Sequence, residues 1–274
     1  MIIDAHAHAC GIFLNGKDII EILDANRVDK VVLVPGELES TKNYSMPDLA
    51  ARFPNTDVVI LTNLLTKVVI GVSGTAKQIE AGNDYVYSLA AGFPERIIQF
   101  YWIRLSLPDP IQILERDFER YGFKGIKIHQ CWESFRIGDD AFIQVAEWAA
   151  SKHLPVFVHL FSKGQAAQLA KYIREHEKPV FIIGHLFGLE RYIEAGIESR
   201  ETYFEISSPA LVSRKRIEKA IEVFGANRVV LGSDIPYGRD NLKANLARVG
   251  NLDISDKEKD LILGENMKKL LSLG

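Results

Sequence analysis

Cysteine is scarce in this chain of 274 residues. Only Cys10 and Cys131 are present, too few for the disulfide framework that stabilises many small secreted domains. We expect two free thiols in a reducing compartment. The first residues also lack the basic segment and small-residue cleavage site of a secretory signal, and Asp4 and His6 interrupt the apolar run that such a signal needs. A cytoplasmic location is therefore expected.

Long apolar runs and an excess of positive charge are also missing. The most apolar stretch, residues 58–72, contains Asn63 and Lys67 and is shorter than the roughly 20 residues that span a bilayer. We expect this stretch to be buried or interfacial, and we expect no membrane partner. The formal net charge of −3 offers no electrostatic attraction for a polyanion, so nucleic acid is disfavoured as a partner.

Short apolar runs alternate with longer helical patterns along the whole chain. This alternation indicates parallel strands joined by crossover helices. The expected strands are residues 2–6, 30–34, 97–103, 125–129, 156–159, 180–184, 202–206 and 228–232. The expected helices are residues 18–26, 84–92, 110–121, 140–152, 165–175, 189–196, 213–224 and 241–249, with a closing helical stretch from Asp256.

Eight strand and helix pairs predict a closed (β/α)8 TIM barrel that occupies residues 1–274 as one domain. An open doubly wound sheet is the alternative, but it usually carries a Gly-rich phosphate turn where this chain has His6 and His8. Residues 36–81 are too long for a bare connection after the second strand. We expect an insertion, helical or a hairpin, that forms a lid over the barrel mouth or the contact of a homodimer.

Histidines cluster at the predicted carboxyl ends of the strands. Side chains alternate along a strand, so His6 and His8 share one face about 6 to 7 Å apart. In parallel barrels the carboxyl ends of the strands carry the functional groups. His153 and His176 instead end helices and are expected at the opposite rim. The five histidines expected at the functional face are His6, His8, His129, His159 and His185.

Asp234 follows the last strand, which lies beside the first strand in a closed barrel. Closure would bring Asp234 close to His6 and His8. Together with His159, these side chains offer nitrogen and oxygen ligands suited to zinc or a similar divalent transition metal, with room for water. We therefore predict a metal site formed by His6, His8, His159 and Asp234.

Five further side chains are candidates for the site, and three of them have more than one interpretation. His185 is a ligand of a second site, a helix cap, or, as we favour, a group for proton transfer or electrostatic stabilisation. Lys127 is a substrate-facing cation, a partner in a core ion pair, or a carboxylated bridge between two metals. His129 is either a substrate contact or a hydrogen-bonded wall residue. Glu205 and Arg104 are candidates for the pocket lining.

Several motifs resemble the amidohydrolase superfamily, most closely its amidohydrolase-related branch of aminocarboxymuconate-semialdehyde decarboxylase-like enzymes. The motifs are Asp-Ala-His-Ala-His at 4–8, Gly-Phe-Lys-Gly-Ile-Lys-Ile-His at 122–129, Val-Phe-Val-His at 156–159, Gly-His at 184–185, Gly-Ser-Asp-Ile-Pro-Tyr-Gly at 232–238 and Ile-Leu-Gly-Glu-Asn at 262–266. The resemblance implies one metal ion on His6, His8, His159 and Asp234, assisted by His185. A second ion is expected only if Lys127 is carboxylated.

One departure and one competing family bear on the resemblance. Residues 36–81 are longer and more apolar than is expected of the family, so substrate identity does not transfer. The DNase-like metal hydrolases also begin with a His-x-His pair, but they usually carry a glutamate ligand on the fourth strand. That strand here reads Gly-Ile-Lys-Ile-His, which disfavours a nuclease.

Three functions remain open at this point. The leading hypothesis is hydrolysis of a small-molecule amide, ester or lactone by a metal-activated water, with Asp234 moving the proton and His185 polarising the carbonyl. The second is nonhydrolytic, metal-dependent decarboxylation of a small unsaturated or aromatic carboxylate. The third is a catalytically silent barrel that uses its metal for assembly or ligand sensing.

Overall fold

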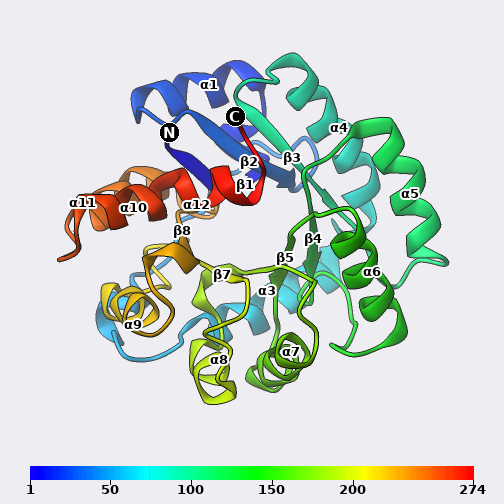
Figure 1. The fold of residues 1–274 in the computed structure, drawn as a ribbon. Coiled ribbons are helices and arrows are strands. Elements are labelled where there is room, and N and C mark those ends of the chain that lie inside the picture. Colours follow the sequence, from blue (N-terminus) through cyan, green and yellow to red (C-terminus); the bar gives the residue numbers. More distant parts are fainter. Residues whose placement is uncertain (74) are drawn as a thin grey trace.

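Eight parallel strands form one sheet in the order of the chain, and the helices surround it (Figure 1). The computed structural model describes residues 1–73 and 75–274; Gly74, within the predicted insertion 36–81, lies outside the described residues. The strands are β1 (Ile3–Ala9), β2 (Lys30–Pro35), β3 (Ile97–Trp102), β4 (Gly125–His129), β5 (Val156–His159), β6 (Phe181–Ile183), β7 (Thr202–Glu205) and β8 (Val229–Val230).

The helices follow the strands as crossover connections. They are α1 (Gly16–Ala25), α2 (Leu49–Arg52), α3 (Val59–Ser73), α4 (Ile79–Gly92), α5 (Pro110–Tyr121), α6 (Asp140–Ser151), α7 (Lys163–Glu175), α8 (Leu189–Ala195), α9 (Arg214–Phe224), α10 (Asn241–Gly250), α11 (Asp256–Asp260) and α12 (Asn266–Leu270). Short helical turns are η1 (Gly11–Phe13), η2 (Thr75–Gln78), η3 (Gly184–Leu186), η4 (Ala226–Arg228) and η5 (Leu261–Glu265). Within the described residues, no helix has the length and apolar content needed to cross a membrane.

Backbone hydrogen bonds between β1 and the residues after β8 close the sheet. The amide of Ala5 donates to the carbonyl of Leu231 at 2.9 Å, and the amide of His8 donates to Ile235 at 2.8 Å. Ala7 and Ile235 form an isolated parallel bridge. The predicted (β/α)8 barrel is therefore confirmed.

The strand register sorts the inward side chains into layers. His129 on β4 pairs with His159 on β5, whereas Lys127 pairs with Phe157 two residues earlier. Because side chains alternate with a period of two, His129 and His159 share one layer and Lys127 lies in the layer below. β1 continues to Ala9 because it pairs with β2 that far, so the His-x-His pair lies inside the strand rather than at its predicted end.

Local sequence signals explain why α5 begins and ends where it was predicted. The carboxylate of Asp109 accepts a hydrogen bond from the amide of Gln112 at 3.0 Å, and Pro110 occupies the first turn. Pro is favoured there because its missing N–H would have no helical partner. Gly122 then adopts φ of 62°, the left-handed conformation that glycine accepts readily at a helix end.

The regular structure of the predicted insertion is helical and follows an irregular segment at residues 36–48. After β2 it contains α2 and α3, and α3 lies against the carboxyl end of β5 (Figure 1). Asp57 attaches this segment to the barrel: its Oδ2 accepts from the amide of Gly188 at 2.7 Å and from Arg216 at 3.3 Å. Arg216 also donates to the carbonyl of Leu186 at 3.0 Å. Asp57 is 3% exposed and Arg216 4%.

We predict that Asp57→Ala destabilises the protein by about 3 kcal/mol, because it leaves the buried Arg216 without one of its charge partners. Urea unfolding followed by circular dichroism measures this difference. Glu222→Gln is the control, since its ion pair with Lys219 is exposed and should contribute less than about 1 kcal/mol. Equal effects of the two substitutions would contradict the prediction.

Candidate metal centre

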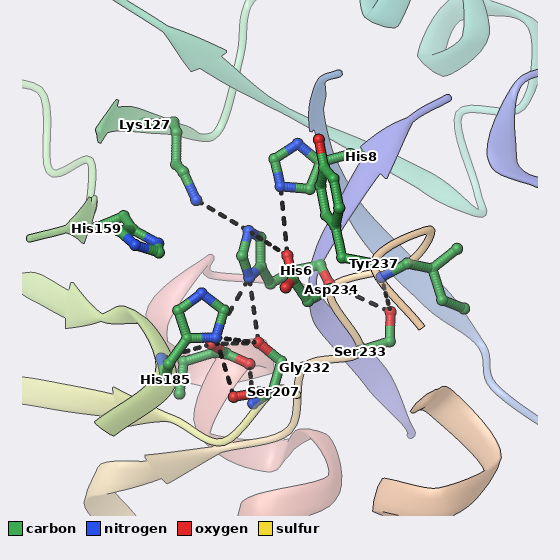
Figure 2. Close-up of polar contacts among 12 residues, drawn as sticks. His6, His8, Lys127, His159, His185, Ser207, Gly232, Ser233, Asp234 and Tyr237 are labelled. Atoms are coloured by element: carbon green, nitrogen blue, oxygen red, sulfur yellow. Dashed lines mark hydrogen bonds and ion pairs between the residues drawn. The ribbon is translucent and has the colours of Figure 1, made fainter. Parts of the chain in front are cut away.

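His6, His8 and Asp234 form a buried cluster at the carboxyl end of the barrel. Their ligand atoms all lie within 4.8 Å of one another. Nε2 of His6 lies 3.7 Å from Oδ1 of Asp234, and Nε2 of His8 lies 3.5 Å from the same oxygen (Figure 2). Two of the three come from β1 and the third from the turn after β8, so barrel closure assembles the cluster.

The turn that carries Asp234 is held by β1. The amide of Asp234 donates to the carbonyl of His6 at 2.7 Å. Ser233 donates its amide and its hydroxyl to the buried carboxylate of Asp4, at 2.8 and 2.6 Å. Burial raises the pKa of Asp4 to about 7. Asp234 itself has φ of 60°, an uncommon conformation that persists because these bonds determine it.

Hydrogen bonds fix which nitrogen of each β1 histidine faces the cluster. Nδ1 of His8 lies 2.8 Å from the carbonyl of Pro35; since a carbonyl only accepts, Nδ1 carries the proton. Nδ1 of His6 faces Oγ of Ser207 at 3.4 Å and Oε2 of Glu205 at 3.6 Å. Burial, and then the charge of Lys127, hold the pKa of His6 well below its usual value. Both rings therefore direct Nε2 toward Asp234.

These residues fit a divalent metal ion. In the neutral ring, the Nε2 lone pair of His8 faces a carboxylate oxygen of Asp234 at 3.5 Å, an arrangement that a cation between them would stabilise. Metal-bound histidines usually donate their other N–H to a carbonyl or carboxylate, as His8 does to Pro35. Imidazole nitrogen and carboxylate oxygen suit zinc and its neighbours. Nζ of Lys127, whose pKa burial lowers to about 7, lies 2.9 Å from Nε2 of His6.

His159, predicted as the fourth ligand, lies apart from this cluster (Figure 2). Its Nε2 is 2.7 Å from Oδ1 of Asn63 on α3. The amide nitrogen of Asn63 donates to the carbonyls of Leu160 and Phe161 at 2.9 and 3.1 Å, so Oδ1 must accept from His159. His159 thus keeps its lone pair on Nδ1, and its role as a ligand stays a prediction.

A second group, His129, Cys131 and His159, also has ligand atoms within 4.8 Å. It suits a metal less well. The rings of His129 and His159 are stacked, with centroids 3.8 Å apart and planes 11° apart, so their in-plane lone pairs run parallel instead of converging. The amide of Cys131 already donates to Nδ1 of His129 at 3.1 Å. Burial raises the pKa of the Cys131 thiol to about 12, which disfavours the thiolate that a metal needs.

His185 faces the same space from η3. Its Nδ1 lies 3.0 Å from the carbonyl of Ser207 and so carries a proton, which leaves Nε2 for the cavity. The ring centroid is 5.6 Å from that of His6 and 4.9 Å from that of His159. Below it, the buried carboxylate of Glu205 accepts from the amide of His185 at 3.1 Å and from the hydroxyl of Ser207 at 2.8 Å.

A cavity of about 280 Å³ opens above these groups. Among the predicted site residues it is lined by His6, His8, His129, His159, His185 and Asp234. Lys127 lies below, over the ring of Phe157 at 3.9 Å, and Arg104 is paired with Glu80 at 2.7 Å. Neither these two nor Glu205 belongs to the described lining. The substrate contacts assigned to Lys127, Arg104, Glu205 and His129 stay predictions.

The cavity also contains residues that the sequence reasoning did not single out. Asn63 binds His159, and Glu37, Trp132 and Tyr237 are among the other lining residues. Asn63 had a signal, because a polar residue in an otherwise apolar helix is typical of an inward hydrogen bond. Glu37 had none, since a glutamate in a long connection is usually solvated. His153 and His176 border a separate depression, in keeping with their predicted place at the other rim.

A (β/α)8 barrel with histidines and an aspartate gathered at one end of its strands defines a broad class of TIM-barrel enzymes. This chain belongs to the amidohydrolase family, whose model matches residues 3–273. The match confirms the resemblance drawn from the motifs. The family binds divalent metals, and the cluster of His6, His8 and Asp234 could hold one.

Three solved structures illustrate the likeness of fold. A putative amidohydrolase from Staphylococcus aureus is 18% identical, with 99% of both chains covered and a TM-score of 0.69. A probable 2-pyrone-4,6-dicarboxylic acid hydrolase from Acinetobacter baumannii is 12% identical, with 99% of both covered and a TM-score of 0.68. A 5-carboxyvanillate decarboxylase from Sphingomonas paucimobilis is 13% identical, with 100% of this chain and 99% of that one covered and a TM-score of 0.69. No curated protein matches the sequence.

We predict that His8→Ala and Asp234→Asn each lower zinc affinity by roughly tenfold or more, because each removes a donor from the cluster. Elemental analysis after reconstitution and dialysis measures the retained metal. His176→Ala is the control, since this histidine lies at the other rim. His159→Ala is expected to lower the metal content as well. Full retention in that variant would mean that His159 is not a ligand.

Proposed function

We propose that this protein is a metal-dependent hydrolase that acts on a small neutral amide, ester or lactone, with zinc as the metal. The observation that supports this proposal is the convergence of the Nε2 atoms of His6 and His8 on the carboxylate of Asp234 at the floor of the cavity. These three side chains would hold the ion, with His159 as the predicted fourth ligand. A divalent ion in such a site lowers the pKa of a coordinated water to about 7 and so supplies a nucleophile at neutral pH.

Asp234 is the proposed proton carrier. Burial opposes its ionisation, but the contact with His8 and the nearby charges of His185 and Lys127 outweigh burial and hold the pKa of this carboxyl below its usual value. The carboxylate is therefore ionised at neutral pH. It accepts a proton from the attacking water and returns that proton to the leaving nitrogen or oxygen of the substrate, so the carboxylate is regenerated after each turnover.

His185 is the proposed group that stabilises the carbonyl oxygen. Its Nδ1 is committed to the carbonyl of Ser207, so Nε2 is the atom that meets the substrate. When Nε2 is protonated, it donates a hydrogen bond to the scissile carbonyl, and this bond strengthens as negative charge develops on the oxygen. Glu205, below the ring, orients His185 through its backbone amide.

The charge of the cavity supports hydrolysis of a neutral compound over decarboxylation. Two of the solved structures of similar fold carry names that refer to carboxylates, a dicarboxylic acid hydrolase and a carboxyvanillate decarboxylase, so the fold alone does not choose the reaction. Apart from the histidines, the charged groups among the described lining residues are Glu37 and Asp234, both acidic. Asp234 would be neutralised by the metal ion that it holds, so Glu37 is the group that would repel a carboxylate substrate. Trp132 and Tyr237 offer an apolar wall to a neutral substrate.

We predict metal-dependent hydrolysis within a panel of neutral aryl esters, amides and lactones. Each neutral compound is paired with an analogue that carries one added carboxylate, and kcat/KM should fall by about tenfold or more for the analogue because of the charge of Glu37. Release of carbon dioxide from unsaturated or aromatic carboxylates without any hydrolysis would replace this proposal by decarboxylation. Failure of both screens with metal bound would indicate the catalytically silent barrel.

For the role of His185, we predict that His185→Gln keeps its metal but loses about 10²-fold in kcat, the scale of one positioned proton donor. Elemental analysis and steady-state kinetics on the same preparation separate the two effects. His176→Gln should match the wild type in both measurements. Loss of metal from His185→Gln would make His185 a ligand instead.

A further inference from the structure

Helix α3 presents its polar side to the barrel. Asn63 is 1% exposed and binds His159. Thr62 and Thr66 are half-buried and line the cavity. Nζ of Lys67 lies 4.4 Å from the ring centroid of Phe161. The side of the helix that a protein core usually makes apolar therefore carries hydrogen-bonding groups and one cation beside the buried Val59 and Ile70.

The opposite side of α3 is apolar and open to solvent. We define the α3 stripe as its seven exposed side chains, which are between 39% and 86% exposed: Ile60, Leu61, Leu64, Leu65, Val68, Val69 and Val72. They are seven of the ten large exposed hydrophobic side chains in the described part of the chain. A helix on the surface of a monomer has the reverse orientation, and a continuous apolar patch of this kind marks an interaction surface.

The spacing within the α3 stripe is that of a helix packed on another helix. Leu61, Leu65, Val68 and Val72 follow one another at intervals of four, three and four residues, the repeat that lines the seam between two paired helices. This seam is about 16 Å long at 1.5 Å per residue. On the same side lies Gly71, where an added Cβ would meet no atom within 4 Å, so a second helix can approach closely.

We propose that the α3 stripe is the contact of a homodimer and that it packs against the same stripe of a second copy. The stripe carries no charged side chain, so a complementary surface is apolar, and the stripe itself is such a surface. Antiparallel packing about a two-fold axis near the middle of the helix brings Leu61 toward Val72 of the partner subunit and Leu65 toward Val68 of the partner subunit. This pairing is self-complementary, as a two-fold interface requires.

A lipid surface suits the α3 stripe less well. Helices that lie in a membrane interface carry basic residues on a solvated polar face. The polar side of α3 is instead packed against the barrel, and its cation, Lys67, lies over Phe161. Charge attraction to anionic lipid is therefore not available from this helix.

The proposed contact borders the cavity. Leu65 and Val69 belong both to the α3 stripe and to the cavity lining, so the second copy would cover the apolar edge of the cavity mouth. Asn63 on the other side of the helix holds His159. Residues 36–81 would then serve as an interface segment that shields the mouth.

Sedimentation equilibrium of the full chain at micromolar concentration tests the proposal. We expect about twice the 30.8 kDa chain mass for the wild type and a single chain mass for the double variant Leu61→Glu, Val68→Glu. Both substituted positions are exposed in one protomer, so circular dichroism should stay unchanged. The matched control is Ala167→Glu, Gln168→Glu, which adds the same charge on the exposed side of α7 and should remain dimeric.

A cysteine variant gives a second, independent readout. Val68→Cys should form a covalent dimer on mild oxidation, whereas Ala167→Cys should not, and the native Cys10 and Cys131 are buried. A monomeric wild type would overturn the proposal, as would a dimer that survives the two glutamates and fails to cross-link at position 68. Binding of the wild type, but not of the glutamate variant, to phosphatidylcholine and phosphatidylserine vesicles would assign the stripe to membranes instead.

Discussion

The candidate site depends on one constraint, the hydrogen-bonded closure of the barrel between β1 and the residues after β8. The amides of Ala5 and His8 donate to Leu231 and Ile235, and the amide of Asp234 donates to His6. These bonds bring groups more than 220 residues apart in the chain to within 3.7 Å. If the turn that carries Asp234 were free to move, its carboxylate would no longer stay close to the imidazoles of His6 and His8. A metal site needs ligand atoms that are held in place.

A buried polar layer beneath the site keeps those donors in place. Asp4 holds the Ser233 turn, Glu205 holds η3 through the amide of His185, and Lys127 contacts His6. Buried polar groups are costly unless they are hydrogen-bonded, and in this layer each of the three has a named partner. Separate bonds, from Nδ1 of His8 to Pro35 and from Nδ1 of His185 to Ser207, determine which ring nitrogen carries a proton, and therefore which nitrogen can bind a metal or a substrate.

Helix α3 connects this site to the surface of the molecule. Its inward Asn63 determines the protonated nitrogen of His159, while its outward side chains form the α3 stripe. The two sides of this apolar segment, residues 58–72, thus have different surroundings. Its polar residues face the cavity, and its apolar residues form an exposed surface that is unfavourable in water.

The sequence by itself determined the barrel and most of the site, because alternating apolar periods, helix caps such as Asp109 and Pro110, and histidines at strand ends are local patterns. Closure of the predicted barrel added the pairing of His6 and His8 with Asp234. Only the tertiary structure decided which ring nitrogens face inward, that Lys127 lies a layer below His129, and that Asn63 binds His159. These features depend on strand register and on contacts between residues distant in sequence, and no local pattern of side chains specifies either of them.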